Sequence, residues 1–150
     1  MQADRNPLRL KNQLCFPIYL CSKEIIRRYA PLLKELDLTY TQYIVMMVMW
    51  EKKCVNVKEL GECLYLDSGT LTPLLKKLEA KKLLTRMRSE KDERHLVVTI
   101  TKEGEDLKEK AVAVPEQIAK CTNLSQEEAL VLYRILYKIL GKNIKNEIEE

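Results

Sequence analysis

The sequence lacks the features that mark several protein classes. Its five cysteines form no C-x-x-C pair and its single histidine is His95, so we expect no metal or other cofactor and assign His95 no role. No apolar run approaches the roughly 18 residues that a membrane span needs, and no signal peptide is recognisable. We therefore expect a cytoplasmic chain with no membrane partner, in which the thiols stay reduced unless one is placed to react.

The composition suits one helical domain. The 150 residues, 46% hydrophobic and 32% charged, are enough for a real core but not for two independent ones. The net charge is only +4, so a strong positive field would have to come from a local cluster.

An amphipathic helix organises the middle of the chain. From Ser68 onward, leucines recur at the i, i+3, i+4, i+7 spacing of one buried helix face: Leu71, Leu74, Leu75 and Leu78. Asp67 or Ser68 is placed to cap this helix, which should end near Lys82. Its outward face is hydroxylic and then basic, with Thr70, Thr72, Lys76 and Lys77.

A second short helix and a hairpin flank this one. Asn56 and Glu59 have the spacing of a capping box for a helix that ends near residues 65–66, a few residues before the next helix begins. Two helices joined by so tight a turn predict a helix-turn-helix. Residues 85–88 and 96–100 alternate around a charged turn, which predicts a β-hairpin. The pattern as a whole is typical of a winged helix.

Basic residues gather in this region. Between Ser68 and Arg88 a single acid, Glu79, stands against Lys76, Lys77, Lys81, Lys82, Arg86 and Arg88. Such a field suits the DNA backbone, and hydroxyl side chains at a helix N-terminus can reach base edges in the major groove. From charge alone a solvated surface helix is an equal alternative, but the helix-turn-helix favours DNA. A protein that coats DNA without sequence preference would carry similar charge.

Helical segments lie on both sides of the winged-helix core, which we place at 39–101 within one domain, 1–150. Residues 8–38 and 102–146 carry apolar faces that one small globule would struggle to cover, so we expect them to be dimerisation helices. A homodimer would set its two recognition helices about one DNA turn apart, ~34–36 Å, or a multiple of it. The predicted fold class is mainly α with a small β-wing, a winged helix-turn-helix flanked by N- and C-terminal dimerisation helices.

Local signals divide these segments further. Pro17 and Pro31 should kink or divide the first, and Pro115 should interrupt the last. Residues 39–52 should form a central helix, because its middle is apolar on nearly every side. Ser125 with Glu128 makes a capping box for the final helix.

Cys15 stands one helical turn before Tyr19, so the phenol and the sulfur can lie close together. A phenolic O–H that donates to a thiolate stabilises the charged form, which is the species that attacks a peroxide. Without further context, however, the favoured interpretation of Cys15 is a small buried hydrophobe.

Longer stretches resemble a known family. The run from Asp67 to Glu79, the wing residues from Arg86 to Arg94 and the Thr101-x-x-Gly104 that follows look like the winged-helix core of the MarR transcriptional regulators. With Gln13-Leu14-Cys15-Phe16-x-x-Tyr19 and the segments 38–46 and 66–78, the sequence resembles the organic-hydroperoxide-sensing branch, the OhrR-like repressors. The resemblance covers most of residues 10–104.

The resemblance implies a dimer on a pseudo-palindromic, double-stranded operator. Ser68, Thr70 and Thr72 would face the major groove, and Arg94, oriented or braced by Asp92, would reach a minor groove. The expected DNA interface also includes the basic residues Lys76, Lys77, Arg86 and Arg88.

The resemblance also makes Cys15 the peroxidatic cysteine. Its hydrogen-bond partners would be Tyr19 and Tyr29, with Tyr40 as a possible third. Phe16, Met46, Met47 and Trp50 could supply an apolar wall, although most such residues are simply core. Pro17 departs from the family pattern and could kink the helix beside the sulfur.

Members of this branch use one functional cysteine or two. Cys121 falls near the position of the second, so a sulfenic acid at Cys15 would condense with the partner subunit's Cys121 or form a mixed disulfide with a small cellular thiol. We expect Cys21, Cys54 and Cys63 to be structural.

The expected function is a redox-sensing dimeric repressor, bound to its operator while Cys15 is reduced and released when an organic hydroperoxide oxidises it. The alternatives are a regulator of broader thiol or virulence stress, a regulator gated by a small phenolic ligand, and, less favoured, a thiol peroxidase. Because no second polar group sits beside Cys15 in the sequence, we expect no enzyme.

Overall fold

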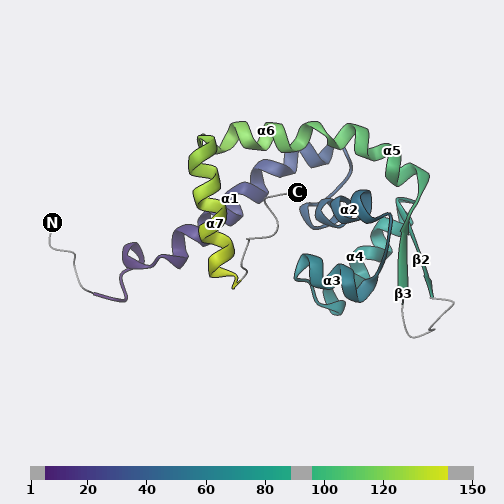
Figure 1. Ribbon diagram of the computed structural model, residues 1–150, viewed down its shortest axis with the longest axis horizontal. Coiled ribbons are helices and arrows are strands. Elements are labelled where there is room, and N and C mark those ends of the chain that lie inside the picture. The colour runs from purple at the N-terminus through teal and green to yellow at the C-terminus, as the bar shows by residue number, and fades with distance from the viewer. Residues whose placement is uncertain (1–5, 89–95, 142–150) are drawn as a thin grey trace. The chain divides into compact units, whose positions relative to one another are not determined.

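The computed structural model describes residues 6–88 and 96–141 and divides the chain into two compact units, Met1–Val114 and Pro115–Glu150. The elements of Figure 1 are η1 (Leu10–Asn12), α1 (Cys15–Lys34), α2 (Tyr40–Lys52), β1 (Cys54–Asn56), α3 (Val57–Leu64), α4 (Ser68–Ala80), β2 (Leu84–Arg88), β3 (Leu96–Ile100), α5 (Lys102–Ala111), α6 (Ala113–Thr122) and α7 (Gln126–Ile139). This mainly helical chain with a small antiparallel wing confirms the predicted fold class. In the described ranges, none of the helices combines the length and apolar character needed to span a membrane.

Helix α2 is the centre of the first unit, as predicted. Thr39 and Gln42 form a capping box at its start, each accepting a hydrogen bond from the other's backbone N–H. Met46, Met49 and Trp50 are buried. The Trp50 Nε1–H donates to the Gly104 carbonyl at 2.7 Å, which ties α2 to α5.

The helix-turn-helix consists of α3 and α4, which lie beside α2 in Figure 1. Tyr65 ends α3 in the left-handed conformation with φ of 54°, and Leu66 N–H bonds back to the Gly61 carbonyl at 3.0 Å. A Cβ at Gly61 would lie 2.7 Å from the Leu66 oxygen, so the turn closes this tightly only around glycine. The predicted leucine stripe of α4 is buried in full.

The capping box predicted for α3 forms only by half. Asn56 accepts from the Glu59 N–H at 2.8 Å, as expected. The Glu59 carboxylate, however, binds Lys52 Nζ at 2.6 Å instead of returning to the cap residue. An ammonium group competes well with a neutral backbone N–H for a carboxylate, because a charge-assisted hydrogen bond is the stronger one.

The wing is part of a three-stranded antiparallel sheet in the order β1-β3-β2. The predicted hairpin is confirmed, with Arg86 opposite Val98. Strand β1, which the sequence did not predict, pairs with β3 so that Cys54 lies opposite Thr99. Strand β2 is therefore an edge strand, and it is the strand nearest α4 in sequence.

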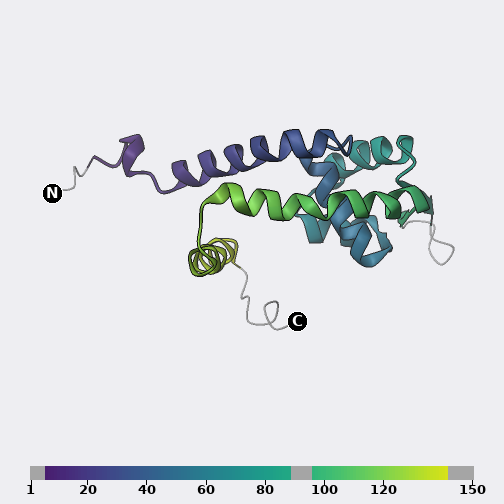
Figure 2. The same ribbon diagram turned by 90° about the horizontal axis from the view of Figure 1, so that it is seen from above.

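Helix α1 continues past both of its prolines, as Figure 2 shows, so neither proline divides it. Pro17 lies in the first turn, where a backbone N–H has no partner within the helix and its loss costs little. Pro31 removes one backbone bond, but Leu33 beyond it is buried against the rest of the first unit. The division expected at these positions is wrong for that reason.

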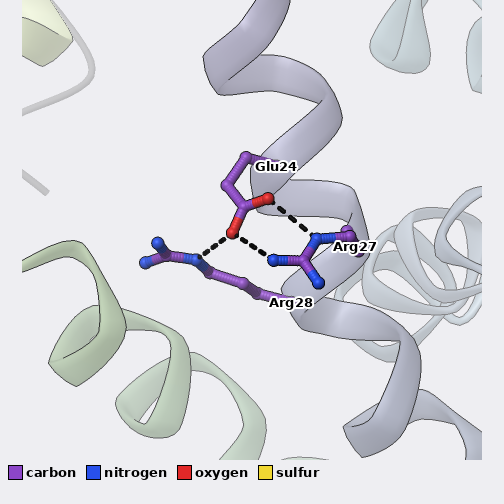
Figure 3. Close-up of polar contacts among 3 residues, drawn as sticks. All are labelled: Glu24, Arg27 and Arg28. Atoms are coloured by element: carbon purple, nitrogen blue, oxygen red, sulfur yellow. Dashed lines mark hydrogen bonds and ion pairs between the residues drawn. The ribbon is translucent and has the colours of Figure 1, made fainter.

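The middle of α1 carries a polar cluster on its surface (Figure 3). Glu24 accepts from Arg27 Nε and Nη2, each at 2.8 Å, and from Arg28 Nε at 3.0 Å. Arg27 and then Arg28 lower the pKa of Glu24 to about 2. The carboxylate therefore stays charged throughout the neutral range and binds both arginines.

The chain after the wing has two breaks. Thr101 caps α5 by accepting from the Gly104 N–H at 3.1 Å. The break predicted near Pro115 occurs at Val112, because the proline cannot donate to the carbonyl four residues before it and its ring crowds that group. Between α6 and α7, Ser125 and Glu128 form the predicted capping box.

Helix α7 is apolar on several sides and none of its residues is buried. The axis of α7 is steeply inclined to that of α6, so α7 is seen end-on in Figure 2. Large exposed side chains lie along it: Leu130, Val131, Leu132, Tyr133, Ile135, Leu136 and Ile139. The exposed apolar side chains of α7 agree with the expectation that this helix contacts a second copy, which remains a prediction.

Candidate DNA interface and sensing cysteine

The start of α4 holds the hydroxyl side chains predicted to face DNA. The two carboxylate oxygens of Asp67 accept from the backbone N–H and the hydroxyl of Thr70, each at 2.9 Å. These bonds lower the pKa of Asp67, so the cap is charged at neutral pH. The Thr72 hydroxyl donates to the Ser68 carbonyl at 2.8 Å. Both threonines are exposed, and they present lone pairs and methyl groups, which suit a base amino group or a thymine methyl.

The basic residues of the predicted interface fall into two groups. Lys76 and Lys77 on α4 and Arg88 at the end of β2 are exposed, as contact with phosphates requires. The Arg86 side chain is only 19% exposed and its guanidinium binds Glu79 at 2.6 Å. Two further predicted residues, Asp92 and Arg94, lie outside the described residues.

Cys15 is the first residue of α1, and its side chain is exposed. This position contradicts the interpretation of Cys15 as a buried hydrophobe. Tyr19, one turn further on, is also exposed and lies under Lys23, whose Nζ is 5.2 Å from the ring centroid. Within the described part of the chain, no hydrogen bond from Tyr19, Tyr29 or Tyr40 reaches the Cys15 sulfur.

Tyr29 and Tyr40 form a pair of their own, with ring centroids 4.9 Å apart. Burial, followed by the neighbouring Tyr40 and Tyr43, raises the pKa of Tyr29, so its phenol remains a hydrogen-bond donor at neutral pH. Fourteen residues of unbroken helix separate Tyr29 from Cys15, which is about 21 Å at 1.5 Å per residue. One chain therefore does not bring the predicted thiolate partners together.

An aromatic residue without a predicted role joins this pair. The Tyr43 ring lies 5.8 Å from Tyr29 and 6.1 Å from Trp50, which links the tyrosine pair to the buried centre of α2. Burial raises the pKa of Tyr43 as well. The spacing of Tyr40 and Tyr43, three residues apart at a helix start, was the available signal, because such positions lie on one face.

The predicted apolar wall is mostly core. Met46 and Trp50 are buried, Phe16 is half-buried, and Met47 is exposed. Exposed positions also hold Cys21, Cys54, Cys63 and Cys121, so no cysteine of the chain serves as a buried hydrophobe. The Cys54 sulfur accepts a hydrogen bond from the Thr99 hydroxyl at 3.5 Å.

Two cavities adjoin these residues. One of about 680 Å³ lies between α3 and the first turn of α4, and Ser68 and Thr72 are part of its lining. The other, of about 460 Å³, lies between the end of α1 and the start of α2, and its lining combines apolar residues with polar and charged ones: Lys34, Asp37, Thr39, Tyr40 and Lys81. No group of side chains in residues 6–88 and 96–141 has the make-up of a metal site.

Comparison with known proteins identifies the family. The family of SarA/Rot transcriptional regulators matches residues 27–111, more than half of the chain. The organic hydroperoxide resistance transcriptional regulator of Bacillus subtilis (strain 168) is 47% identical over 140 residues, which is 93% of this chain and 95% of that protein. This match confirms the resemblance to the OhrR-like branch.

Solved structures agree. AbfR, which is from Staphylococcus epidermidis, has a reduced form bound to DNA with 37% identity and a TM-score of 0.74, covering 89% of this chain and 93% of that one. Its disulfide form has 36% identity and a TM-score of 0.64, covering 88% and 93%. The reduced form of MarR from E. coli has 26% identity and a TM-score of 0.70, covering 85% and 96%.

These relatives are transcriptional regulators and not enzymes, so the thiol peroxidase alternative is excluded. The second helix of the helix-turn-helix, here α4, is the recognition helix, and winged-helix regulators contact DNA with this helix and the wing beside it. The chain therefore belongs to the MarR/SarA family of DNA-binding transcriptional regulators, in the group that contains OhrR and AbfR.

Proposed function

We propose that this regulator is a redox-sensing dimeric repressor that acts in the cytoplasm. It binds a pseudo-palindromic operator while Cys15 is reduced and leaves it when an organic hydroperoxide oxidises Cys15. The observation that carries the proposal is the exposed thiol at the start of α1, one turn before Tyr19. The similarity to a hydroperoxide resistance regulator and to AbfR in reduced and disulfide forms supports it.

Exposed apolar faces support a dimer. Ile18, Ile25 and Ile26 are exposed on α1, and α7 is exposed along its whole length. A monomer would leave all of this surface in water, which the hydrophobic effect opposes. In a dimer with two-fold symmetry the same apolar faces of the two copies pack against each other, so both faces of both copies are covered.

The spacing along α1 suggests how two copies complete the sensing site. Cys15 lies seven residues before Ser22, and Tyr29 lies seven residues after it. Two α1 helices that cross antiparallel at Ser22 would place Cys15 opposite the partner subunit's Tyr29, and Ile18 opposite the partner subunit's Ile26. This arrangement supplies the Tyr29 donor, which a single chain holds about 21 Å from Cys15, and the small Ser22 lets the helices approach closely.

Such a dimer presents two recognition helices to one face of DNA. The start of each α4 would enter the major groove, and Lys76, Lys77 and Arg88 would contact phosphates. Half-sites one DNA turn apart, ~34–36 Å, or a multiple of it, would match the two-fold axis. Because both helices must fit at once, a small rotation between subunits removes much of the affinity.

Oxidation begins when the Cys15 thiolate attacks a hydroperoxide. The sulfur takes the terminal OH of the hydroperoxide and is oxidised by two electrons while the O–O bond breaks; the alkoxide leaves and takes up from solvent the proton that the thiol released on ionisation. The resulting sulfenic acid then loses its oxygen as water when a second thiol attacks the sulfur. That thiol is the partner subunit's Cys121, which would join α1 to α6 across the dimer, or a small cellular thiol.

Non-reducing electrophoresis with intact mass tests this chemistry. Wild type, Cys15→Ser and Cys121→Ser are given a stoichiometric dose of cumene hydroperoxide, and DNA binding is measured on the same samples. Cys21→Ser is the matched control, since Cys21 is another exposed cysteine of α1. We expect a covalent dimer and loss of DNA binding in wild type and Cys21→Ser, and neither change in Cys15→Ser.

The other outcomes each have a meaning. If wild type gains one oxygen or a small-thiol adduct but no covalent dimer, the sensor works with Cys15 alone. If Cys15 stays unmodified while DNA binding persists, the redox proposal is wrong and a regulator without a peroxide switch remains.

A ligand-gated regulator is the second candidate, and the cavity of about 460 Å³ favours it. Its size is in the range of small-molecule sites, and it combines apolar walls with Tyr40 and Lys34, groups that suit a phenol or a carboxylate, while Lys81 is already paired with Asp37 at 2.9 Å. Release from DNA by such a compound under reducing conditions, in wild type and in Cys15→Ser alike, would support this function in place of the redox one.

A further inference from the structure

Arg86 is counted in the basic surface by its sequence, but it is held inside the protein. Its Nε and Nη2 both donate to Glu79 Oε2, at 3.0 and 2.6 Å. The other carboxylate oxygen, Oε1, accepts from the Arg86 backbone N–H at 3.0 Å. The side chains are 19% and 35% exposed, so the pair is partly withdrawn from solvent.

These bonds connect two parts of the DNA interface. Glu79 is in the last turn of α4, and Arg86 is the middle residue of β2. Strand β2 is at the edge of the sheet, so the Arg86 N–H that points away from β3 has no partner in a strand. The Glu79 carboxylate accepts hydrogen bonds from that N–H and from the guanidinium, and so fixes both the position and the rotation of β2 relative to α4.

A second attachment lies at the base of the wing. The Thr101 hydroxyl donates to the Lys82 carbonyl at 2.6 Å, and the Thr101 N–H donates to the Leu83 carbonyl at 3.1 Å. These bonds hold the turn between α4 and β2. One attachment alone would leave the wing free to swing about that turn, whereas a second one further along β2 fixes its angle to α4.

We propose that the Glu79–Arg86 ion pair sets the angle between the recognition helix and the wing, and that Arg86 is a positioning residue and not a phosphate contact. The inference rests on the DNA-binding part of the proposed function and is independent of the redox part. The ion pair keeps Arg88, at the end of the same strand, in register with Lys76 and Lys77 on α4.

Removing a charge distinguishes a positioning role of the Glu79–Arg86 pair from a phosphate contact by Arg86. If Glu79 were only an acid near DNA, its removal would reduce repulsion of the phosphates and strengthen binding. If Glu79 positions the wing, its removal weakens binding although the protein becomes more positive. Loss of a phosphate contact also reduces the magnitude of the negative slope of log affinity against log salt by about 0.9, and loss of a positioning residue does not.

The test uses reduced, full-length protein and a DNA duplex that the wild type selects from a random pool. Affinities are measured from low to high salt for wild type, Glu79→Gln, Arg86→Gln and Arg86→Lys. Lys76→Gln is the control for a lost phosphate contact. Glu109→Gln is the control for a lost acid, since Glu109 is exposed on α5 and has no partner among the described residues.

We expect Glu79→Gln, Arg86→Gln and Arg86→Lys each to weaken binding by about tenfold with an unchanged salt slope. The lysine keeps the charge but cannot make the two-donor contact, so a phosphate role would leave its affinity near that of wild type. The charge exchange Glu79→Arg with Arg86→Glu should recover part of the affinity. Trp50 fluorescence and thermal melting confirm that each variant is folded.

The proposal is overturned if Glu79→Gln binds as well as or better than wild type, or if Arg86→Gln makes the negative salt slope shallower by about 0.9. Hydroperoxide plays no part in these measurements. Failure of the redox switch would therefore leave them unchanged, and failure of the ion-pair proposal would leave the Cys15 experiment unchanged.

Discussion

Replacing Gly104 with alanine should destabilise the first unit by about 3 kcal/mol. A Cβ there would lie 2.1 Å from the Leu83 carbonyl oxygen, which is backbone already held by the Thr101 N–H. Helix α5 must therefore move, and its movement strains the bond from Trp50 Nε1 to the Gly104 carbonyl. Overpacking destabilises by about 1–3 kcal/mol, and a buried donor without its acceptor by about 1–3 kcal/mol more. The higher helix propensity of alanine offsets about 1 kcal/mol of this loss, which leaves about 3 kcal/mol.

Urea unfolding at a fixed protein concentration measures this loss, with the fluorescence of Trp50, the single tryptophan of the chain, as the probe. With a slope of about 2 kcal/mol per molar, the midpoint should fall by roughly 1.5 M. Gly69→Ala is the control for a contact with a side chain instead of backbone: its Cβ would lie 2.9 Å from the Asp67 carboxylate, so its loss should not exceed that of the helix cap, about 1 kcal/mol. A Gly104→Ala midpoint equal to that of wild type would refute this account of the α5 contact.

Three further predictions follow from neighbouring contacts. Met46→Ala should cost about 2–5 kcal/mol in the same assay and Met47→Ala less than about 1, because the side chains are 0% and 46% exposed; equal losses would contradict the assigned burial. Because the pKa of Tyr29 is raised, the folded protein keeps this proton after the unfolded chain has lost it, so stability falls above about pH 10. Tyr29→Phe should flatten that fall in urea titrations between about pH 9 and 11, and an identical fall would argue against the burial of the phenol. Asp67→Asn should keep the cap but free the Thr70 hydroxyl proton, changing discrimination at one base pair by about tenfold; selection from a random DNA pool by both proteins would show it, and identical preferences would count against a base contact by Thr70.

The parts of the fold that depend on neighbouring residues were predictable. The leucine stripe of α4 and the caps at Asp67 and Ser125 follow from side chains within a few residues of one another. Strand β1 was not, since its three residues have no period and acquire their structure only by pairing with β3, more than forty residues away.

For the sensing site and the DNA interface, too, the sequence predicted relations between neighbouring residues but not those between distant ones. Sequence placed Cys15 one turn before Tyr19, but it could not show that an unbroken α1 carries Tyr29 away from the sulfur. Pro17 was expected to kink or divide this helix and does not divide it, because the proline falls in the first turn, and where a helix begins is not fixed by the proline itself. Arg86 counted as a basic surface residue until the structure placed the Glu79 carboxylate against it.

The position of Glu79 also bears on how the protein avoids aggregation. An edge strand with free N–H groups is a template to which a strand of another chain can add. The Glu79 carboxylate occupies the N–H at the middle of β2 and places a negative charge against that edge. An incoming strand would have to displace it and leave the Arg86 guanidinium without a partner. The contact that holds the wing beside the recognition helix thus also protects the open side of the sheet from intermolecular pairing.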